Sequence, residues 1–221
     1  MPDCGNQVLI LGAASSFIGE AIELAEECGL RIAALITNIP LPSEQPIRWS
    51  YPLYELASLP SEMRALPAVC ILTTPAYRKI LVDEALKLGV CHYGLLVHPT
   101  AAVAKSAFIG LGSFVNTRAI IASNTILGSH VLVNRGASIG HDCVLDDFCT
   151  LGPGVTTGAF VHVHSGAFLG VGSVILPSLT IGCNAVVAGG AVVTQDVPDS
   201  TLVAGIPAVI KKENMIGYRR R

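Results

Sequence analysis

Residues 127–152 read LGSHVLVNRGASIGHDCVLDDFCTLG, and an aliphatic side chain returns there at every sixth position. The same rule holds from Val97 to Val193, with Thr157 as the single exception, and a mostly small residue stands four places after each aliphatic one. A period of six fits neither an α-helix nor an alternating strand kept over such a length, whereas hexapeptide repeats are typical of parallel β-helices. The sequence therefore predicts a solenoid for the C-terminal half of the chain.

The place directly after each aliphatic residue is often held by Gly, Asn or Asp. Gly110, Gly128, Asn134, Gly140 and Asp146 are examples. These residue types tolerate the backbone angles that a chain needs when it turns a corner every few residues. We therefore expect this place in each hexad to make the corner.

The first 96 residues follow a different pattern, in which buried strands alternate with helices. Residues 7–12 are expected to form a strand that leads through Ala13–Ser16 into a helix ending near Gly29. The other elements expected from apolar runs and helical spacing are strands at 31–36, 68–72 and 92–96 and a helix at about 76–88. This alternation predicts a small parallel sheet of Rossmann type. The five prolines within residues 39–60 predict an irregular crossover.

The turn after the first strand is a candidate site for a phosphate, because backbone N–H groups at a helix N-terminus can bind an anion. The dinucleotide motif G-x-G-x-x-G is broken there, since Ala14 and Ser15 occupy its middle. No acidic residue ends the second strand, where Thr37 and Asn38 stand, and this also disfavours NAD. Two interpretations stay open, a purely structural cap and a site for the phosphates of a nucleotide-linked substrate.

Composition limits the class of partner. The formal net charge of −2 and the pI of about 6.3 disfavour nucleic acid. Only 14% of the residues are charged, which favours burial of surface in an oligomer. Seven cysteines without a CxxC pair, and no signal peptide or apolar run of about 18 residues, predict a cytoplasmic protein that does not contact membranes. The basic residues Lys211, Lys212 and Arg219–Arg221 are expected to form a solvated tail, and contact of Lys211 or Lys212 with a phosphate is the alternative.

The hexapeptide pattern resembles the left-handed parallel β-helix of the hexapeptide-repeat acyltransferases. With the Rossmann-like cap, Asn134, the run Gly140-His141-Asp142 and the closing segment Gly205–Ala208, nearly the whole chain is similar to the sugar N- and O-acetyltransferases of the bacterial bacillosamine, perosamine and sialic-acid pathways. The resemblance implies an α/β Rossmann-like domain over residues 1–96, which binds a nucleotide-sugar. It also implies a left-handed β-helix acetyltransferase domain with a C-terminal tail over residues 97–221, and a homotrimer with active sites between subunits.

The family's activity would be acetyl transfer from acetyl-CoA to the amino group of a nucleotide-linked amino sugar, as in the biosynthesis of lipopolysaccharide O-antigen. His141 matches the family's general base, and Asp142 matches the acidic residue that supports it. Imidazole titrates near neutrality and can accept a proton from an amine, so no metal is required. The substrate contacts that the resemblance implies are Ala14, Ser15, Ser16, Thr37, Asn38, Thr73 and Asn134. The coenzyme contacts that it implies are Thr150, Val171 and Gly189.

Two departures from the family pattern affect these assignments. Some relatives carry a second histidine nine residues after the base, where it contacts the coenzyme, and this chain has Thr150 at that place. Relatives that recognise uridine carry acidic residues where Thr37 and Asn38 stand. A different base is therefore favoured, and a GDP-linked sugar with a 4-amino group, such as perosamine, is the preferred substrate.

Other functions stay open at the level of sequence. A zinc enzyme of the carbonic-anhydrase type is suggested by His162 and His164, although a zinc site needs a third protein ligand. A non-catalytic trimeric scaffold would also use both domains, and His141 would then be an ordinary surface histidine. Transfer to a hydroxyl group, as in sialic-acid O-acetylation, cannot be separated from transfer to an amine.

Overall fold

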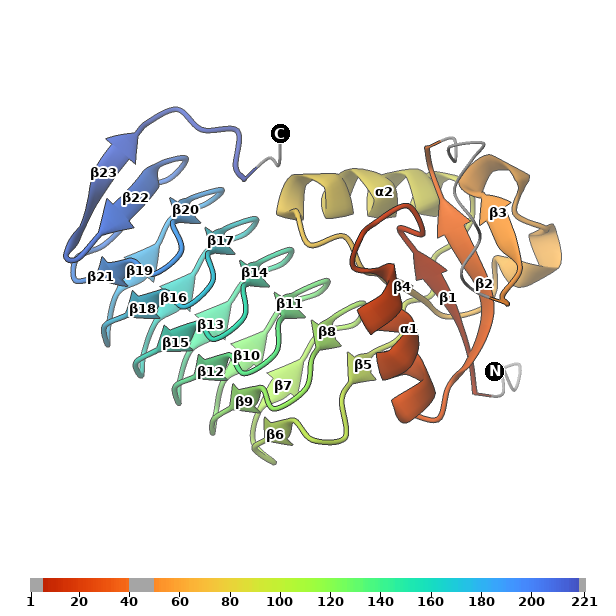
Figure 1. Cartoon of the computed structure of the whole chain (residues 1–221), viewed down its shortest axis with the longest axis horizontal. Coiled ribbons are helices and arrows are strands. Elements are labelled where there is room, and N and C mark those ends of the chain that lie inside the picture. The colour runs from red at the N-terminus through yellow and green to blue at the C-terminus, as the bar shows by residue number, and fades with distance from the viewer. Residues whose placement is uncertain (1–5, 40–49, 219–221) are drawn as a thin grey trace.

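The computed structural model describes residues 6–39 and 50–218. An α/β cap, residues 6–95, lies against one side of a long β-helix (Figure 1). Of the features expected from the sequence, the prolines at 40, 42 and 46 and the basic residues 219–221 lie outside the described residues. Among the described residues, no helix combines the length and the apolar character that a membrane span requires.

The cap is built on a four-stranded parallel sheet in the order β3-β2-β1-β4. Its strands are β1 (Gln7–Leu11), β2 (Arg31–Thr37), β3 (Leu53–Glu55) and β4 (Ala68–Cys70). Side chains alternate along each strand, so Val8 and Ile10 pack against helix α1 (Ile18–Glu27), while Leu9 and Leu11 pack on the side of helix α2 (Pro75–Lys87). Burial on both faces explains why the strands read as continuous apolar runs.

Two expectations for the cap are wrong in detail. Strand β3 and the 3₁₀ turns η1 (Leu56–Ser58) and η2 (Ser61–Met63) lie within or just after the segment expected to be irregular. Residues 92–96 form no fourth strand of the sheet, because their pairing with it is a single bridge from Tyr93 to Ala68. Strand β3 is a short edge strand that directly follows Pro52, and edges are the places in a sheet where proline is tolerated.

The β-helix has three parallel sheets, which we call faces I, II and III in chain order. Face I contains β5 (Leu96–Val97), β8 (Phe114–Val115), β11 (Leu132–Val133), β14 (Thr150–Leu151), β17 (Phe168–Leu169) and β20 (Val186–Val187). Face II contains β6 (Ala102–Val103), β9 (Ile120–Ile121), β12 (Ser138–Ile139), β15 (Thr156–Thr157), β18 (Val174–Ile175) and β21 (Val192–Val193). Face III contains β7 (Phe108–Ile109), β10 (Ile126–Leu127), β13 (Val144–Leu145), β16 (His162–Val163) and β19 (Thr180–Ile181).

One coil takes 18 residues, because Ile126 pairs with Val144 and Val144 with His162. The predicted interior is confirmed: aliphatic residues such as Leu127 and Leu145, and small ones such as Ala137, are fully buried. Thr157, the exception in the aliphatic series, is also buried, and its hydroxyl accepts a hydrogen bond from the Gly140 N–H at 3.1 Å. The predicted architecture, an α/β cap followed by a parallel β-helix, is thus the observed one.

The corners do not follow the expectation drawn from the glycines. Positive φ angles occur three places after the aliphatic residue, as at Asn124 (59°), His130 (56°) and Asp142 (57°), rather than at the next place. Glycine is required directly after the aliphatic residue for a different reason, because a side chain there would have no room. A Cβ atom on Gly110 would lie 2.5 Å from the backbone of Gly128 in the following coil, where real Cβ atoms are not found. Stacking of coils therefore selects these glycines.

The chain closes with a hairpin of β22 (Leu202–Gly205) and β23 (Ala208–Lys212), in which β22 extends face I. Lys211 and Lys212 are therefore exposed strand residues and not part of a loose tail. After the hairpin, the Tyr218 ring stacks on the Phe168 ring of face I, with 3.8 Å between centroids.

Candidate functional site

His141 stands at the corner between faces II and III, which we call the II/III corner and which residues 140–143 form in this coil. Its Nδ1 atom lies 2.6 Å from Oδ2 of Asp142, and its side chain is 52% exposed. The His141 ring also meets the Phe160 ring edge to face, with centroids 5.2 Å apart. The imidazole is therefore held on two sides while the rest of the ring faces solvent.

The stacking of coils places Asp142 for this contact. Asp142 occupies the positive-φ place of its hexad, directly above Asn124 of the preceding coil, whose amide donates a hydrogen bond of 3.0 Å to Oδ1. The hydrogen bond with His141, and after it the one from Asn124, lowers the pKa of Asp142. The carboxylate therefore remains charged at neutral pH beside the imidazole.

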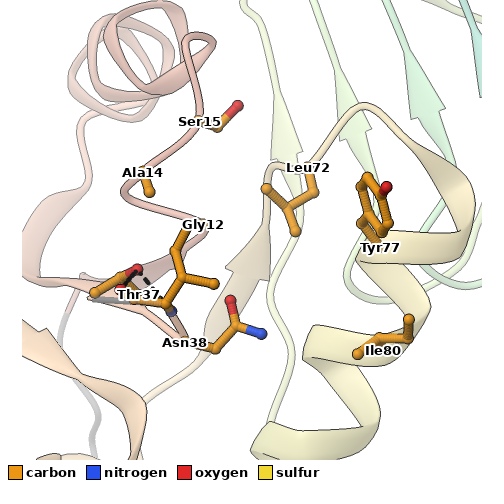
Figure 2. A pocket seen from close by; sticks show the side chains of 9 residues that line it. Gly12, Ala14, Ser15, Thr37, Asn38, Leu72, Tyr77 and Ile80 are labelled. Atoms are coloured by element: carbon orange, nitrogen blue, oxygen red, sulfur yellow. Dashed lines mark hydrogen bonds between the residues drawn. The ribbon is translucent and has the colours of Figure 1, made fainter. Parts of the chain in front are cut away.

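The cap contains a pocket of about 300 Å³ at the ends of β1 and β2 (Figure 2). It joins four of the predicted substrate contacts, Ala14, Ser15, Thr37 and Asn38. Ile39, Leu72, Tyr77 and Ile80 complete the wall with apolar surface, and Tyr77 and Ile80 project from α2. The sequence did not predict that α2 lines the pocket, because nothing in the pattern of that helix marks two of its apolar side chains as half exposed.

Polar groups at this pocket are partly engaged by the cap itself. The Thr37 hydroxyl donates a hydrogen bond of 2.8 Å to the Ile39 carbonyl, and the Ser15 hydroxyl accepts one of 3.2 Å from the Phe17 N–H. The Asn38 amide nitrogen donates to Glu84 of α2 at 2.7 Å. The side-chain oxygen of Asn38 is thereby left pointing away from the carboxylate as an acceptor for a ligand.

Thr73 and Thr150, predicted to contact substrate and coenzyme respectively, meet each other where the cap joins the β-helix. The Thr150 hydroxyl donates to the Thr73 carbonyl and accepts from Arg78, both at 2.9 Å. Thr150 is 1% exposed. These contacts give the Thr150 hydroxyl a structural task, and its role toward a coenzyme stays a prediction.

Three other predicted residues gather at the corner between faces I and II. Asn134 is buried there, and its side-chain oxygen accepts hydrogen bonds from Asn116 and from the Arg135 N–H. Val171 and Gly189 lie one coil apart, and a Cβ atom on Gly189 would come within 3.2 Å of the Val171 carbonyl oxygen. This I/II corner is separated from His141 by the width of face II.

Within the described residues, the hydrogen bonds, ion pairs and ring contacts between the cap and the β-helix all lie on the side away from His141. Glu20 pairs with Arg135 at the I/II corner, and Arg78 reaches His130 and Thr150 at and beside the corner between faces III and I. His141 occupies the remaining corner of the triangular coil. The pocket and the histidine of one chain therefore lie on different sides of the same prism.

A second histidine-rich cluster lies at the corner between faces III and I. Asp146 Oδ1 is 3.1 Å from His162 Nε2, and Asp146 Oδ2 is 2.9 Å from His164 Nδ1. Burial acts to raise the pKa of Asp146, but the hydrogen bonds from His164 and His162 outweigh it and the pKa is lowered. Sequence reasoning noted the two histidines and missed Asp146, which the 18-residue coil places directly beneath His164.

Comparison with known proteins shows which solved structures this chain resembles. No model of a protein family matches the chain. A histidine-to-asparagine variant of perosamine N-acetyltransferase from Caulobacter crescentus, solved in complex with CoA and GDP-perosamine, is 30% identical, with a TM-score of 0.83 over 94% of this chain and 97% of that one. The acetyltransferase domain of PglB from Neisseria gonorrhoeae, in complex with acetyl coenzyme A, is 26% identical, with a TM-score of 0.81 over 93% and 99%.

Curated relatives match shorter stretches. Galactoside O-acetyltransferase from Lactococcus lactis is 36% identical over 53 residues, which are 24% of this chain and 26% of that protein. The chain spans 22–33% of the length of such curated relatives. The full-length agreement therefore comes from the solved structures.

Proposed function

The chain belongs to the hexapeptide-repeat sugar acetyltransferases, and from this membership we propose that it transfers an acetyl group from acetyl-CoA to the amino group of a nucleotide-linked amino sugar. The preferred substrate is a GDP-linked 4-amino sugar of the perosamine type. The observation that carries the proposal is the pairing of a half-exposed His141 with Asp142 at an open corner of the β-helix.

His141 acts as the general base. Because Nδ1 lies against the Asp142 carboxylate, the neutral ring keeps its proton on Nδ1 and presents the lone pair of Nε2 to solvent. Nε2 takes a proton from the sugar amine as the nitrogen attacks the thioester carbonyl. The tetrahedral oxyanion then collapses, the C–S bond breaks, and the imidazolium returns the proton to the departing CoA thiolate. Asp142 stabilises the positive ring between these two steps.

The cap pocket takes the nucleotide. Its volume of about 300 Å³ and its apolar walls suit a base lying against Tyr77 and Ile80. Guanine offers N–H donors on one edge, which match the free oxygen of Asn38 and the carboxylate of Glu84. The turn at Ala14 and Ser15, beside the start of α1, is placed for the diphosphate. GDP-perosamine in the related Caulobacter crescentus complex supports this choice of ligand.

Two copies of the chain are needed to complete a site. The His141 corner and the cap pocket lie on different sides of one prism, so an acceptor held by one cap must meet the histidine of another chain. A neighbour that turns its I/II corner toward the II/III corner of the first chain would bring Val171, Gly189 and its own cap close to His141. This arrangement accords with a homotrimer, the smallest ring in which such a heterologous contact closes on a prism.

The decisive measurement is thiol release from acetyl-CoA with GDP-, UDP- and CMP-linked 4-amino sugars. His141→Asn is expected to lower kcat by about 10²–10⁴-fold, the usual contribution of a general base. The matched control is His92→Asn, an exposed histidine of the cap, which should leave kcat unchanged. Mass spectrometry of the product, followed by mild alkaline treatment, distinguishes an amide, which survives, from an ester of the alternative O-acetyl transfer.

A complementation assay tests the shared site separately. Ala14→Glu places a negative charge where the diphosphate is expected and should abolish turnover, as His141→Asn does. Mixing the two inactive variants after subunit exchange should restore part of the activity, because some interfaces then combine an intact pocket with an intact histidine. Unchanged turnover in His141→Asn would remove this residue from the mechanism, and no activity on any of the three sugar nucleotides would overturn the substrate class.

A further inference from the structure

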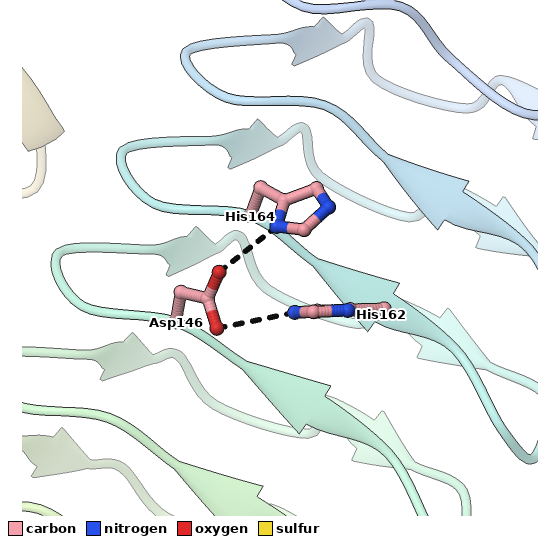
Figure 3. Close-up of side chains that lie close together, drawn as sticks. All are labelled: Asp146, His162 and His164. Carbon is pink, nitrogen blue, oxygen red and sulfur yellow. Dashed lines mark hydrogen bonds and ion pairs between the residues drawn. The ribbon is translucent and has the colours of Figure 1, made fainter.

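The cluster of Asp146, His162 and His164 is the one group of three potential metal ligands within residues 6–39 and 50–218 (Figure 3). One ligand atom from each residue lies within 4.8 Å of the other two. The Asp146 oxygens point at the two imidazoles, at 3.1 Å from His162 and 2.9 Å from His164. In a tetrahedral zinc site with bonds of about 2.0 Å, neighbouring ligand atoms are about 3.3 Å apart. The two separations from Asp146 are close to this value, and the ligand nitrogens of His162 and His164 lie within 4.8 Å of each other.

The stacking of coils makes the cluster a local departure from the repeat. The place that Asp146 and His164 occupy is the one directly after the aliphatic residue of face III, and the other coils carry Gly110, Gly128 and Gly182 there. Among these coils, this place therefore carries a polar side chain only in the two adjacent coils of Asp146 and His164. His162 adds its ring from strand β16, where the coils below carry Val144 and Ile126. Two imidazoles and one carboxylate therefore meet at a corner where the other coils carry glycine after the aliphatic residue.

We propose that Asp146, His162 and His164 form a site for a divalent transition metal, with Zn²⁺ as the best match. Two imidazole nitrogens and one carboxylate oxygen are a ligand set that zinc accepts in proteins, and they leave a fourth position for water or an anion. The three side chains are 33–40% exposed, so a metal can reach them from solvent without opening the fold. A groove of about 260 Å³, lined in part by Asp147 and Ser165, adjoins Asp146.

The site is separate from the chemistry proposed for His141. Asp146 and His164 lie at the corner between faces III and I, whereas His141 lies at the II/III corner. Binding would tie two successive coils together through Asp146 and His164, and its expected consequence is added stability of the β-helix.

The test is equilibrium dialysis of the tag-free full chain against ZnCl₂ at neutral pH after treatment with a chelator, with zinc counted by elemental analysis. We expect one zinc ion per chain and a rise in the thermal unfolding temperature. Asp146→Asn and His162→Ala should each weaken binding by at least about 10-fold, because each removes one of three ligands. Since the readout is binding, it is independent of whether the chain transfers acetyl groups.

Controls separate this cluster from other histidines and thiols. His141→Asn removes the other exposed His–Asp pair and should still bind one zinc ion. His164→Gly installs the residue that this place carries in other coils, so it keeps the β-helix intact and should lose the metal. Absence of stoichiometric zinc from the wild-type chain would overturn the proposal. Equal binding by wild type and His164→Gly would also overturn it, and the three side chains would then be an ordinary hydrogen-bonded group.

Discussion

The II/III corner and the corner between faces III and I are built on the same backbone but present opposite environments. At the first, His141 is half exposed and contacts Asp142 and Phe160 of its own β-helix. At the second, His130 is 7% exposed, stacks on Phe148 with centroids 5.0 Å apart, and meets the edge of Tyr93. The difference is the cap, which covers the second corner at His130 and Phe148 and leaves His141 uncovered. Coils with the same backbone therefore present different environments, depending on whether the cap covers them.

Arg78 is the main link between the cap and the covered corner. It is 1% exposed, and its guanidinium donates to the carbonyls of His130, Phe148 and Cys149 as well as to the Thr150 hydroxyl. Burial lowers the pKa of Arg78 to about 10, with Cys70 and Cys149 acting in the opposite sense. Arg78 therefore stays charged at neutral pH. It donates hydrogen bonds to backbone carbonyls that the cap shields from water.

Loss of this link should have the largest effect. Arg78→Met leaves several buried carbonyls without a donor, and we expect the free energy of unfolding to fall by about 3–5 kcal/mol. Lys79→Ala is the control. Lys79 forms an exposed pair with Asp83 and lies over the Phe148 ring at 5.5 Å, so its loss should cost about 1 kcal/mol or less. Denaturant unfolding at fixed protein concentration measures both. If Arg78→Met lowers the free energy of unfolding no more than the control does, Arg78 is not the main link between the cap and the covered corner.

His130 should make stability depend on pH at the covered corner. Burial, followed by the positive charge of Arg78, lowers the pKa of His130 to about 4 against the weaker opposing effect of Asp147 and Asp83. Below about pH 6.5, His130 therefore binds a proton in the unfolded chain but stays neutral in the folded chain. Stability is lost as the pH falls from about 6.5 to about 4, by up to about 3 kcal/mol.

Replacement by an aromatic residue isolates this effect. His130 has a positive φ, and Phe148 and Phe160 adopt the same conformation, so His130→Phe fits the backbone. The difference in unfolding free energy between pH 7 and about pH 4.5 should be smaller in the variant than in the wild type. Equal pH dependence in the two proteins would mean that His130 does not titrate as a buried group.

The interior of the β-helix could be predicted because it depends on residue size at a fixed spacing. Leu127 and Leu145 face inward for the same reason in every coil, so the hexad pattern is visible without knowledge of contacts. The glycines were misjudged, because their cause is the backbone 18 residues away and not their own φ angle. A comparison of residues 18 positions apart in the sequence would have predicted both the close approach of Gly110 to Gly128 and the pairing of Asp146 with His164.

The candidate site was predictable only where a motif lies in one stretch of chain. His141 and Asp142 are neighbours, and Thr37 and Asn38 end one strand, so each pair was found together. Arg78 could not be found in this way, because its backbone acceptors on the β-helix lie 52–71 residues further along the chain and carry no side-chain signal. A backbone carbonyl looks the same in every sequence.

Glycine replacements sharpen the claim that the corners share one backbone. A Cβ atom on Gly110 would lie 2.5 Å from Gly128, and one on Gly140 would lie 2.4 Å from Gly158. Gly110→Ala and Gly140→Ala should therefore cost a similar amount, about 1–3 kcal/mol, although they sit at different corners. Gly136→Asn is the control, since no atom of the described residues lies within 4 Å of its Cβ site and Asn124 shows that asparagine adopts the positive φ. Its cost should stay below about 1 kcal/mol.

The smallest expected effect tests the exposed corner by activity and not by stability. Asp142→Asn keeps the positive φ, as Asn124 and Asn184 do, but replaces the carboxylate that supports the His141 imidazolium. We expect kcat to fall by about 10-fold, with KM for the sugar nucleotide and the unfolding temperature nearly unchanged. Asn124→Ala, which removes only the hydrogen bond to Asp142, should lower kcat by less. If Asp142→Asn instead lowers stability and leaves kcat intact, the exposed corner is structural like the covered one, and the two environments differ without a difference in function.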